Sequence, residues 1–356
     1  MSKILFLTDT HIGCRNSHSI IEEHILKFHT YILEYIKQNK IKEVFHLGDM
    51  VDDRKNMNIK TWNRFKTSFF DHLRDMGVEL TVLCGNHDTY FRSHNEVNAL
   101  DTLFNKQEYP NVTVINKPTE VIIGKTNFLL MPWMHNSHFE EYKTVIEESK
   151  ADVLCAHLEM HGFIMHSGVI STDGMETATF EHFDNVFTGH YHSKSSKGNI
   201  HYLGTAYDTS WADIFDKKYF HIFDSKAGLL TPVEYDDRLF TRLVYNDTKY
   251  KLEVPTNLSG KFVKLIVRGK TDILGFETLL NEINKQEPFE LSIVDETLLI
   301  GDTDFEADEQ SMADISSVIT DSIEGLQDTE SVDKAKLKVL MQELYRDAIS
   351  EMISEE

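Results

Sequence analysis

Five short polar motifs carry the residue types that hold divalent metals in proteins, and each follows a short apolar stretch. The motifs are D-x-H at 9–11, G-D-x-x-D at 48–52, G-N-H-D at 85–88, a histidine at 157 and G-H-x-H at 189–192. Carboxylate, imidazole and amide oxygen together suit borderline divalent metals such as Mn²⁺, Fe²⁺ or Zn²⁺. Each motif alone is typical of a turn or a helix cap, but five in this order rarely occur together by chance. The candidate residues are Asp9, His11, Asp49, Asp52, Asn86, His87, His157, His190 and His192.

Two of the motifs place metal-binding residue types two positions apart. In an extended segment residues i and i+2 point the same way, so Asp9 with His11 and His190 with His192 can each address one cluster. A carboxylate such as Asp49 can bridge two metals about 3.5–4 Å apart, an arrangement in which the bridging water becomes a nucleophile near neutral pH. Glycine allows the tight backbone turns that such ligands need, and it occurs at Gly48, Gly85 and Gly189.

The apolar runs before the motifs predict the strands that position them. Short buried strands are expected at 3–8, 44–47, 80–84, 152–156 and 185–188. Apolar residues at helical spacing predict helices at 19–37 and 59–76. This alternation indicates an α/β fold with a mostly parallel first sheet. Because ligands bind outside the carboxyl ends of strands in such sheets, we expect the five motifs to meet in one crevice.

After Pro110 the predicted elements become shorter and richer in strands. Strands at 112–115, 120–123 and 127–131 are expected to form a second sheet packed on the first, followed by hairpin-like strands at 200–203 and 219–223. A strand at 262–268, a helix at 271–286 and a strand at 291–300 then predict a small α+β unit. The predicted division of the chain is 1–225, 226–300 and 301–356.

The last part of the chain is strongly acidic. Residues 301–356 contain 16 Asp and Glu against four Lys and Arg, with an acidic linker at 302–310. Helical periodicity follows at 312–326 and 332–353, and it would suit a helix packed on its own domain. The acidic linker favours instead a tethered helical segment that docks on a partner.

Composition limits the classes of partner. The chain has 356 residues and a formal net charge of −22, so we do not expect it to hold nucleic acid through bulk charge. A bound metal centre can reverse the sign locally. Arg54 lies next to the metal loop and is the best candidate for contact with a DNA backbone.

Other sequence features indicate the compartment. Three scattered cysteines argue for a reducing cytosol and against a disulfide framework. No apolar run approaches 18 residues, which predicts no membrane span. The apolar run at the N-terminus is too short for a signal peptide.

The motifs resemble those of the calcineurin-like metallophosphoesterases and, within them, of SbcD-type nuclease subunits in the phage recombination-endonuclease form. The matching stretches are LTDTHIG (7–13), HLGDMVDDRK (46–55), LCGNHDTY (83–90), MPWM (131–134), AHLEMHGF (156–163), TGHYHS (188–193) and YLGT (202–205). The resemblance implies an α/β fold: a two-sheet sandwich flanked by helices, with a small α+β DNA-capping domain and C-terminal partner-binding helices.

The resemblance also implies roles for the motif residues. One metal would be held by Asp9, His11, Asp49 and His192, and the other by Asp49, Asn86, His157 and His190. His87 would protonate the leaving 3′-oxygen or stabilise the phosphorane. The preferred metal would be Mn²⁺, with Mg²⁺ as the other candidate.

The partners implied by the resemblance are double-stranded DNA with its ends and an SbcC-like coiled-coil ABC ATPase, bound by the C-terminal helices. The family forms homodimers within a heterotetramer, for which the segments 14–30 or 92–106 would supply the surface. Such an enzyme would act in DNA recombination, repair and replication, in the cytoplasm of a bacterial host if it comes from a phage.

One residue departs from the SbcD-type pattern. Cellular SbcD-like nucleases usually have histidine where this chain has Asp52. We expect the Asp52 carboxylate to hydrogen-bond the His87 ring and favour its protonated form.

Three functions compete. The leading one is a Mn²⁺-dependent DNA exonuclease and endonuclease. A phosphoprotein or nucleotide phosphatase or phosphodiesterase of the same fold is disfavoured because protein phosphatases of this class usually read G-N-H-E. A non-catalytic scaffold is disfavoured because all the expected ligand positions and His87 are present.

Overall fold

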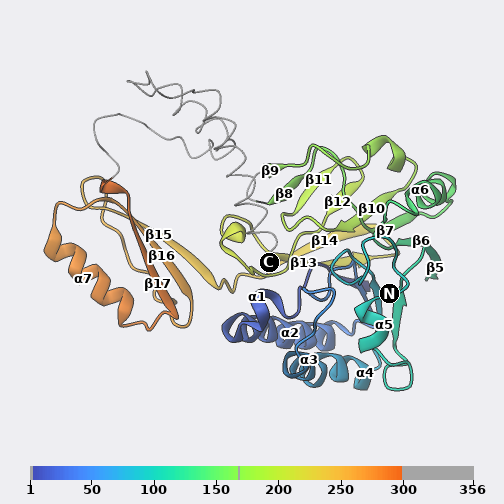
Figure 1. The fold of residues 1–356 in the computed structure, drawn as a ribbon, viewed down its shortest axis with the longest axis horizontal. Helices are drawn as coiled ribbons and strands as arrows, with labels where there is room; N and C mark the ends of the chain where they lie inside the picture. Colours follow the sequence, from blue (N-terminus) through green and yellow to red (C-terminus); the bar gives the residue numbers. More distant parts are fainter. Residues whose placement is uncertain (1–2, 167–168, 299–356) are drawn as a thin grey trace, which may run out of the picture. The chain divides into compact units, whose positions relative to one another are not determined.

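The computed structural model describes residues 3–166 and 169–298, whose helices and strands are drawn in Figure 1. The helices expected at 312–326 and 332–353 lie outside the described residues. Within the described part, no helix combines the length and the apolar character that crossing a bilayer requires.

The first sheet contains the strands that precede three of the motifs. Its strands are β1 (Lys3–Leu7), β2 (Glu43–His46), β3 (Glu79–Leu83), β4 (Val112–Ile115), β13 (Tyr219–Asp224) and β14 (Leu229–Glu234), in the order β14-β13-β1-β2-β3-β4. β1 to β4 are parallel, and β13 pairs antiparallel with both β1 and β14. The predicted parallel sheet is therefore confirmed, with an antiparallel hairpin added at one side.

The second sheet contains the strands that precede the other two motifs. Its strands are β5 (Thr119–Ile123), β6 (Thr126–Met131), β7 (Val153–His157), β10 (Asn185–Gly189), β11 (Ser195–Lys197) and β12 (Ile200–Tyr202), in the order β11-β12-β10-β7-β6-β5. β6, β7, β10 and β12 are parallel. The predicted strands 200–203 and 219–223 each join a hairpin, but in different sheets.

An apolar layer joins the faces of the two sheets. Phe6 and Phe45 from the first sheet pack against Phe128 and Phe187 from the second, with edge-to-face ring contacts at 5.3–5.6 Å between centroids. All four rings are buried. Each such ring contributes about 1.5–3 kcal/mol through burial, so this layer fixes one sheet against the other and confirms the predicted sandwich.

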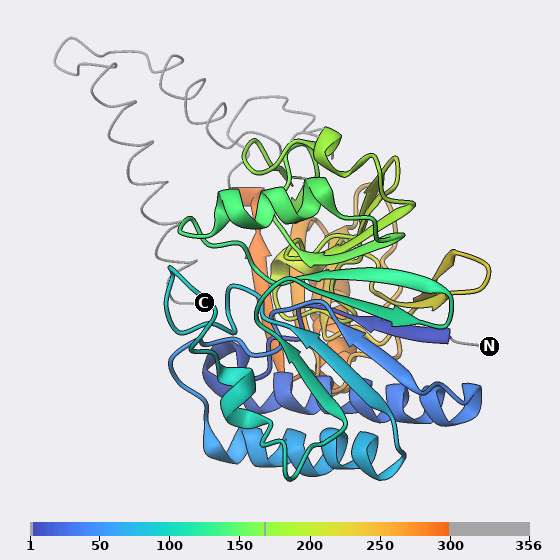
Figure 2. The ribbon, with the colours of Figure 1, turned by 90° about the vertical axis from the view of Figure 1, so that its right-hand side faces the viewer.

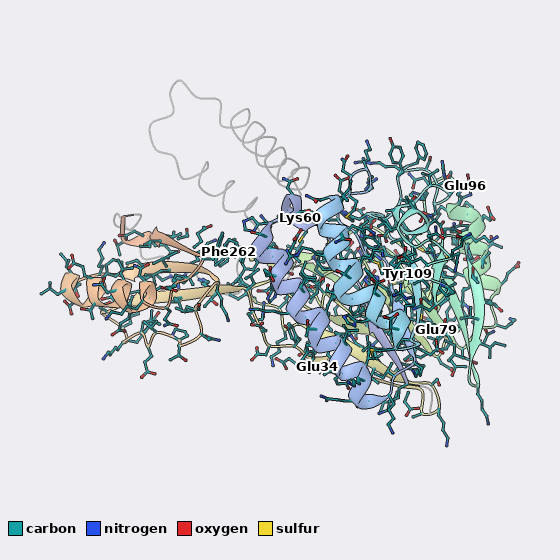
Figure 3. All side chains as sticks on the ribbon, turned by 90° about the horizontal axis from the view of Figure 1, so that it is seen from below. Glu34, Lys60, Glu79, Glu96, Tyr109 and Phe262 are labelled. Atoms are coloured by element: carbon teal, nitrogen blue, oxygen red, sulfur yellow. The ribbon has the colours of Figure 1, made fainter. Side chains whose placement is uncertain are left out.

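Helices cover the outer faces of the sandwich. They are α1 (Cys14–Ser17), α2 (Ser19–Asn39), α3 (Ile59–Phe65), η1 (Lys66–Phe70), α4 (Asp71–Asp75), α5 (Ala99–Leu103) and α6 (Phe139–Glu148). Figure 2 shows α2 and the α3–α4 run beneath the first sheet and α6 above the second. The periodic residues Ile21, Ile25, Phe28, Ile32 and Ile36 of α2 are all buried, as predicted. Figure 3 shows α2 and α3 lying side by side, with Glu34 on α2 and Lys60 on α3.

Short elements complete the sandwich. They are β8 (Ile164–His166), β9 (Val169–Ile170), η2 (Thr177–Phe180) and η3 (Trp211–Asp213). The last of these begins with a capping box. The Ser210 side chain accepts a backbone N–H from the first turn, and the Asp213 side chain accepts the backbone N–H of Ser210.

A parallel three-stranded sheet follows. It consists of β15 (Phe240–Asn246), β16 (Phe262–Gly269) and β17 (Glu290–Asp295), accompanied by α7 (Ile273–Asn284) and η4 (Glu296–Leu298). It has its own apolar cluster, in which Leu258, Val263 and Ile283 are buried. The first sheet extends to Glu234, beyond the predicted boundary at 225, whereas the role of residues 226–300 as a DNA cap stays a prediction.

Candidate metal centre

The five motifs lie at the carboxyl ends of β1, β2, β3, β7 and β10, where the two sheets meet. Backbone hydrogen bonds join the first two: Asp9 N–H donates to Gly48 O at 3.0 Å, and His11 N–H donates to Asp49 O at 3.1 Å. Across the sandwich, His190 N–H donates to both carboxylate oxygens of Asp9 at 3.1 Å. The structure thus brings motifs from both sheets together at one place.

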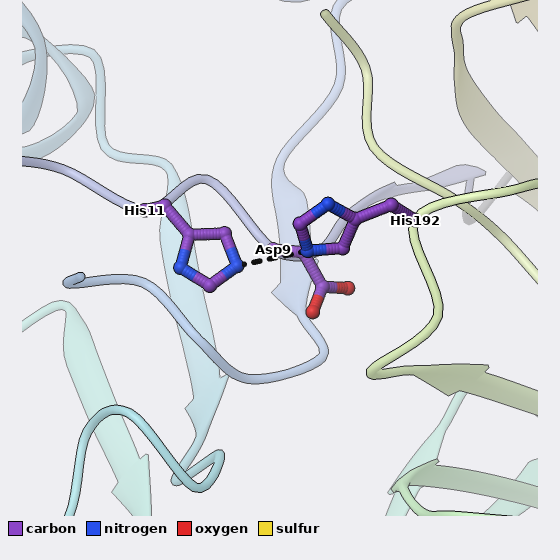
Figure 4. Close-up of side chains that lie close together, drawn as sticks. All are labelled: Asp9, His11 and His192. Atoms are coloured by element: carbon purple, nitrogen blue, oxygen red, sulfur yellow. Dashed lines mark hydrogen bonds between the residues drawn. The ribbon is translucent and has the colours of Figure 1, made fainter. Parts of the chain in front are cut away.

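One cluster of ligand-type atoms consists of Asp9, His11 and His192, and its three atoms lie within 4.8 Å of one another. The Nε2 atoms of His11 and His192 are 3.1 Å apart and face each other beside the Asp9 carboxylate (Figure 4). Two converging imidazole nitrogens and a carboxylate form a donor set that suits a borderline divalent cation.

A second cluster consists of Asp49, His157 and His190, again within 4.8 Å. The side-chain oxygen of Asn86 lies 3.1 Å from His157 Nε2 and 3.1 Å from His190 Nδ1. His157 Nδ1 lies 2.7 Å from the carbonyl oxygen of Leu47, which can only accept, so Nδ1 carries the proton. This second contact orients His157 Nε2 toward the cluster, as is usual for histidines that bind metals.

Four of these residues have a left-handed backbone. Asp9, His11, Asp49 and His190 have φ values of 50°, 41°, 52° and 86°. Non-glycine residues rarely adopt positive φ, and each such position costs on the order of 1–3 kcal/mol. The surrounding hydrogen bonds therefore hold the motifs in a conformation that the chain does not prefer locally.

The three motif glycines make room for the ligands. A Cβ on Gly85 would collide with Asp49 Oδ1, and a Cβ on Gly48 would collide with the His157 ring. A Cβ on Gly189 would lie 2.9 Å from Asp9 Oδ2. Only Gly48 among them has a left-handed φ, of +98°, so the other two are needed for close approach rather than for a turn.

Positive charge close to the buried carboxylates Asp9 and Asp49 would stabilise their ionised forms. Burial, reinforced by the charge of Asp49, raises the pKa of Asp9. Burial alone would also raise the pKa of Asp49, but the charges of His157 and His87 hold it well below the usual range. Although burial opposes it, the charge and hydrogen bond of Asp49 raise the pKa of His157 to about 9. A divalent cation would meet the same electrostatic need.

The pKa values of the other histidines of the candidate centre are shifted in opposite directions, upward for His11 and downward for His190 and His192. Burial acts to lower the pKa of His11, but the hydrogen bond with Asp52, assisted by Asp49, raises it to about 10. Burial and nearby histidine charges lower the pKa of His190 and of His192 to about 3. Both rings are therefore neutral and can offer a lone pair to a metal.

His87 lies beside the first cluster, with its ring 4.9 Å from that of His11. The backbone N–H of His87 donates to Asp49 Oδ1 at 2.8 Å, and its ring atom Nδ1 lies 2.5 Å from the carbonyl oxygen of Asp52. The Asp52 carboxylate instead lies 3.3 Å from His11 Nδ1. The expected hydrogen bond between the Asp52 carboxylate and the His87 ring is therefore wrong: the backbone carbonyl takes that place because the side chain turns toward the buried His11.

Arg54 lies near the centre and is partly buried. Burial and the charge of Arg92 lower its pKa, whereas the carboxylate of Asp49 acts in the opposite direction. Its contact with DNA stays a prediction.

Sequence reasoning gave no role to Asp88 or Trp133. The fully buried Asp88 carboxylate accepts N–H bonds from Gly85, Met50 and Val51 at 2.8–3.1 Å, and so joins two motif loops. In the sequence, the only indication of this role was its position as the last residue of the G-N-H-D motif. The centroid of the Trp133 ring lies 5.0 Å from that of the His190 ring. In the sequence, this role was indicated by the M-P-W-M stretch that contains Trp133.

A buried ion pair behind His192 was also missed. Lys218 Nζ donates to Asp213 Oδ1 and to Thr205 Oγ1, both at 2.6 Å. The N–H of Thr205 in turn donates to the carbonyl oxygen of His192 at 3.0 Å. Lys218 is almost fully buried, and no local sequence pattern distinguishes it from its exposed neighbour Lys217.

Comparison with known proteins agrees with this geometry. The family model of the calcineurin-like phosphoesterases matches residues 2–194. Exonuclease subunit 1 of Enterobacteria phage T4 is 29% identical over 350 residues, which cover 98% of this chain and 94% of that protein.

Two solved structures are also similar. An archaeal phosphodiesterase is 12% identical, with a TM-score of 0.35 over 65% of this chain and 99% of that one. The calcineurin-like phosphoesterase YfkN from Bacillus subtilis is 11% identical, with a TM-score of 0.36 over 65% of this chain and 88% of that one.

Proposed function

Because the chain belongs to the calcineurin-like phosphoesterase family, we propose that it is a metal-dependent nuclease that hydrolyses the phosphodiester bonds of DNA. The observation that carries the proposal is the pair of buried ligand clusters at the junction of the two sheets. Similarity to a phage exonuclease subunit over nearly the whole length of both chains supports DNA as the substrate.

The two clusters would hold two divalent ions, preferably Mn²⁺. Asp9, His11 and His192 would hold one, while Asn86, His157 and His190 would hold the other. Asp49 would bridge them, since one of its oxygens lies 3.3 Å from His157 Nε2. When bound, such ions activate water and stabilise charge on a phosphoryl group.

His87 supplies a proton in this proposal. A carbonyl oxygen only accepts hydrogen bonds, so the contact with Asp52 O keeps the ring proton on Nδ1. Nε2 is then the atom that exchanges protons, and protonated His87 would deliver one to the leaving 3′-oxygen. The hydrogen bond from the backbone N–H of His87 to Asp49 Oδ1 couples the position of His87 to that of a proposed metal ligand.

The partner is a further part of the proposal. The T4 relative is named as a subunit, which supports a complex of more than one chain. We propose that residues 301–356 bind a coiled-coil ABC-type ATPase of the SbcC kind, and that the nuclease forms a homodimer within a heterotetramer. The complex would act in recombination, repair and replication in a bacterial cytoplasm.

The test is degradation of linear double-stranded DNA by the full chain, with Mn²⁺, Mg²⁺ or EDTA, and with and without the ATPase partner. The wild type is compared with His87→Ser. His72→Ser is the matched control, because His72 is an exposed histidine on α4. We expect degradation only with a divalent metal, and loss of about 10²–10⁴-fold in His87→Ser alone.

A different result would reassign the substrate. If the metal-loaded protein leaves DNA intact in every condition but hydrolyses bis(p-nitrophenyl) phosphate, the nuclease proposal fails. The function is then a phosphatase or phosphodiesterase of the same fold. If His87→Ser and His72→Ser behave alike, the proposed role of His87 fails.

A further inference from the structure

Two aromatic side chains stand exposed a few residues after the G-N-H-D motif. Tyr90 and Phe91 are 42% and 43% exposed, although they follow directly on the buried Asp88 and Thr89. Their rings contact each other edge to face, with centroids 4.8 Å apart. Exposed neighbouring rings of this kind are typical of a surface that binds a partner.

The loop that carries these rings is held in place. Tyr90 N–H donates to Val97 O at 2.9 Å, and Thr89 and Asn98 form an isolated β-bridge. The buried side chain of Asn95 donates to Trp133 O at 2.9 Å. The loop is therefore tied at its base to the strand ends of the metal centre, and it presents its rings in a defined position.

Three cations are neighbours of the rings or of one another in sequence, because Arg92 follows Phe91 and Arg54 precedes Lys55. Lys55 Nζ lies 5.9 Å from the centroid of the Tyr90 ring. Arg54 lies close enough to Asp49 and to Arg92 for their charges to shift its pKa. In residues 3–166 and 169–298, no carboxylate forms an ion pair with these three cations, whereas Arg64 and Arg74 do form such pairs. Unpaired cations are notable in a chain with a net charge of −22.

We propose that Tyr90 and Phe91 form a stacking platform for a base of the DNA strand that enters the metal centre, while Arg54, Lys55 and Arg92 hold its phosphates. Non-specific single-strand sites combine exposed rings with cations that follow the backbone in this way. The inference rests on the proposed nuclease function and goes further, because it predicts that the enzyme recognises an unpaired base near the cleaved bond.

Charge favours nucleic acid over a second protein surface here. Stacking on a ring face is available to every base, so the platform gives no sequence preference. A protein partner would have to supply carboxylates to the three cations, which pair with none in the part of the chain that the structure describes. The contact of Lys55 with the Tyr90 ring, together with the charge interaction between Arg54 and Asp49, points to a substrate that reaches the candidate metal centre.

The test compares two linear duplexes, one with normal bases at its terminal nucleotides and one with abasic sugars there. Wild type, Tyr90→Leu/Phe91→Leu and Tyr90→Phe are assayed for Mn²⁺-dependent degradation. Tyr31→Leu is the matched control, because Tyr31 is 39% exposed and lies on α2. Leucine keeps apolar bulk but removes the flat ring, so the substitution tests stacking itself.

We expect the wild type, Tyr90→Phe and Tyr31→Leu to prefer the base-bearing duplex about tenfold, the size expected when one base loses an aromatic partner. The double variant should lose that preference and approach the wild-type rate on the abasic duplex. The proposal is overturned if the preference persists in the double variant, or if that variant slows equally on both duplexes.

Two further readouts separate the alternatives. If sedimentation shows that only the double variant changes its oligomeric state, the rings cover a second copy of the chain and the proposal is overturned. If the wild type degrades no DNA but hydrolyses bis(p-nitrophenyl) phosphate, the nuclease function fails by itself. In that case, fluorescence anisotropy with base-bearing and abasic oligonucleotides tests the stacking platform separately. Equal affinities of the wild type for both oligonucleotides would overturn the platform. A preference for the base-bearing oligonucleotide that the double variant lacks would support it.

Discussion

At the scale of single residues, the candidate metal centre requires the close approach of several backbone segments as well as suitable ligand types. Asp9, His11, Asp49 and His190 adopt a backbone that costs free energy, and three glycines lack the Cβ atoms that would obstruct neighbouring motif residues. Small steric changes here should therefore reduce activity without removing any ligand.

Substitution Gly85→Ala tests this directly. Its Cβ would collide with Asp49 Oδ1 and displace the carboxylate that we propose bridges the two metals. We expect hydrolysis of bis(p-nitrophenyl) phosphate to fall by about 10²-fold, since misplacement by about 1 Å is enough for such a loss. Gly198→Ala is the control, because a Cβ there meets no atom within 4 Å. Equal losses in both variants would contradict the steric explanation.

A second residue-scale prediction concerns pH. His29 is buried in α2, stacks on Phe69 at 4.0 Å between centroids, and has its pKa lowered to about 3 by burial. Because the unfolded chain takes up this proton near pH 6.5 and the folded chain does not, stability is full above 6.5 and falls as the pH drops toward 3. His29→Phe should remove this loss, which amounts to about 2 kcal/mol at pH 5.

Urea denaturation at pH 7 and pH 5 checks the prediction. The free energy of unfolding should fall less between the two pH values in His29→Phe than in the wild type. A control is His72→Phe, at an exposed position, which should retain the wild-type difference. If His29→Phe and the wild type lose the same free energy, the buried ring is not the source.

At the scale of elements, the loop between β12 and β13 supports His192, one of the proposed metal ligands, through its backbone. The buried pair Lys218–Asp213 fixes Thr205, whose N–H binds the carbonyl of His192. Asp213 also accepts N–H bonds from Thr209 and Ser210, so the pair organises the whole loop. This network explains why His192, far from β1 in sequence, stays at hydrogen-bonding distance from His11.

Lys218→Met should weaken this support. Removing one partner of a buried ion pair costs about 3–5 kcal/mol, because the other charge stays buried. We expect lower stability and a Mn²⁺ affinity reduced about tenfold, the lower end of the loss seen when a group that orients a ligand is removed. Lys217→Met is the control, since Lys217 pairs with Glu234 at the surface.

The informative comparison is Mn²⁺ binding by calorimetry at a temperature where both variants are fully folded. A purely structural role for Lys218 would lower the melting temperature and leave the Mn²⁺ affinity of the folded protein unchanged. That outcome would contradict the positioning role.

At the scale of the whole molecule, net charge limits how the proposed nuclease can bind DNA. The chain carries −22, and Arg54, Lys55 and Arg92 form no ion pair with a carboxylate of the residues that the structure describes. Binding should therefore rest on few phosphate contacts and on the metals, and depend only moderately on salt.

We expect a plot of log affinity against log salt concentration to have a slope of about −2 to −3, the value for three phosphate contacts. The measurement uses His87→Ser with Mn²⁺ and a linear duplex, so that binding is separated from cleavage. Replacing the three cations by glutamine should bring the slope close to zero. A much steeper slope that survives this replacement would place the main DNA contacts elsewhere.

The sequence by itself determined the family, the two-sheet α/β fold and the candidate residues of the metal centre. It could do so because strand and helix periodicities are local, and because metal-binding residue types at strand ends converge at the carboxyl edge of a parallel sheet. The comparison with known proteins confirms the family, and the structure confirms the sandwich.

The tertiary structure alone decided how those residues face one another. The partner of Asp52, the bracing of two loops by Asp88 and the support of His192 by Lys218 all join segments distant in sequence. Sequence periodicity cannot report such contacts, because they depend on which buried polar atoms meet once the sheets have packed. The requirement that each buried polar group finds a partner then selects one arrangement.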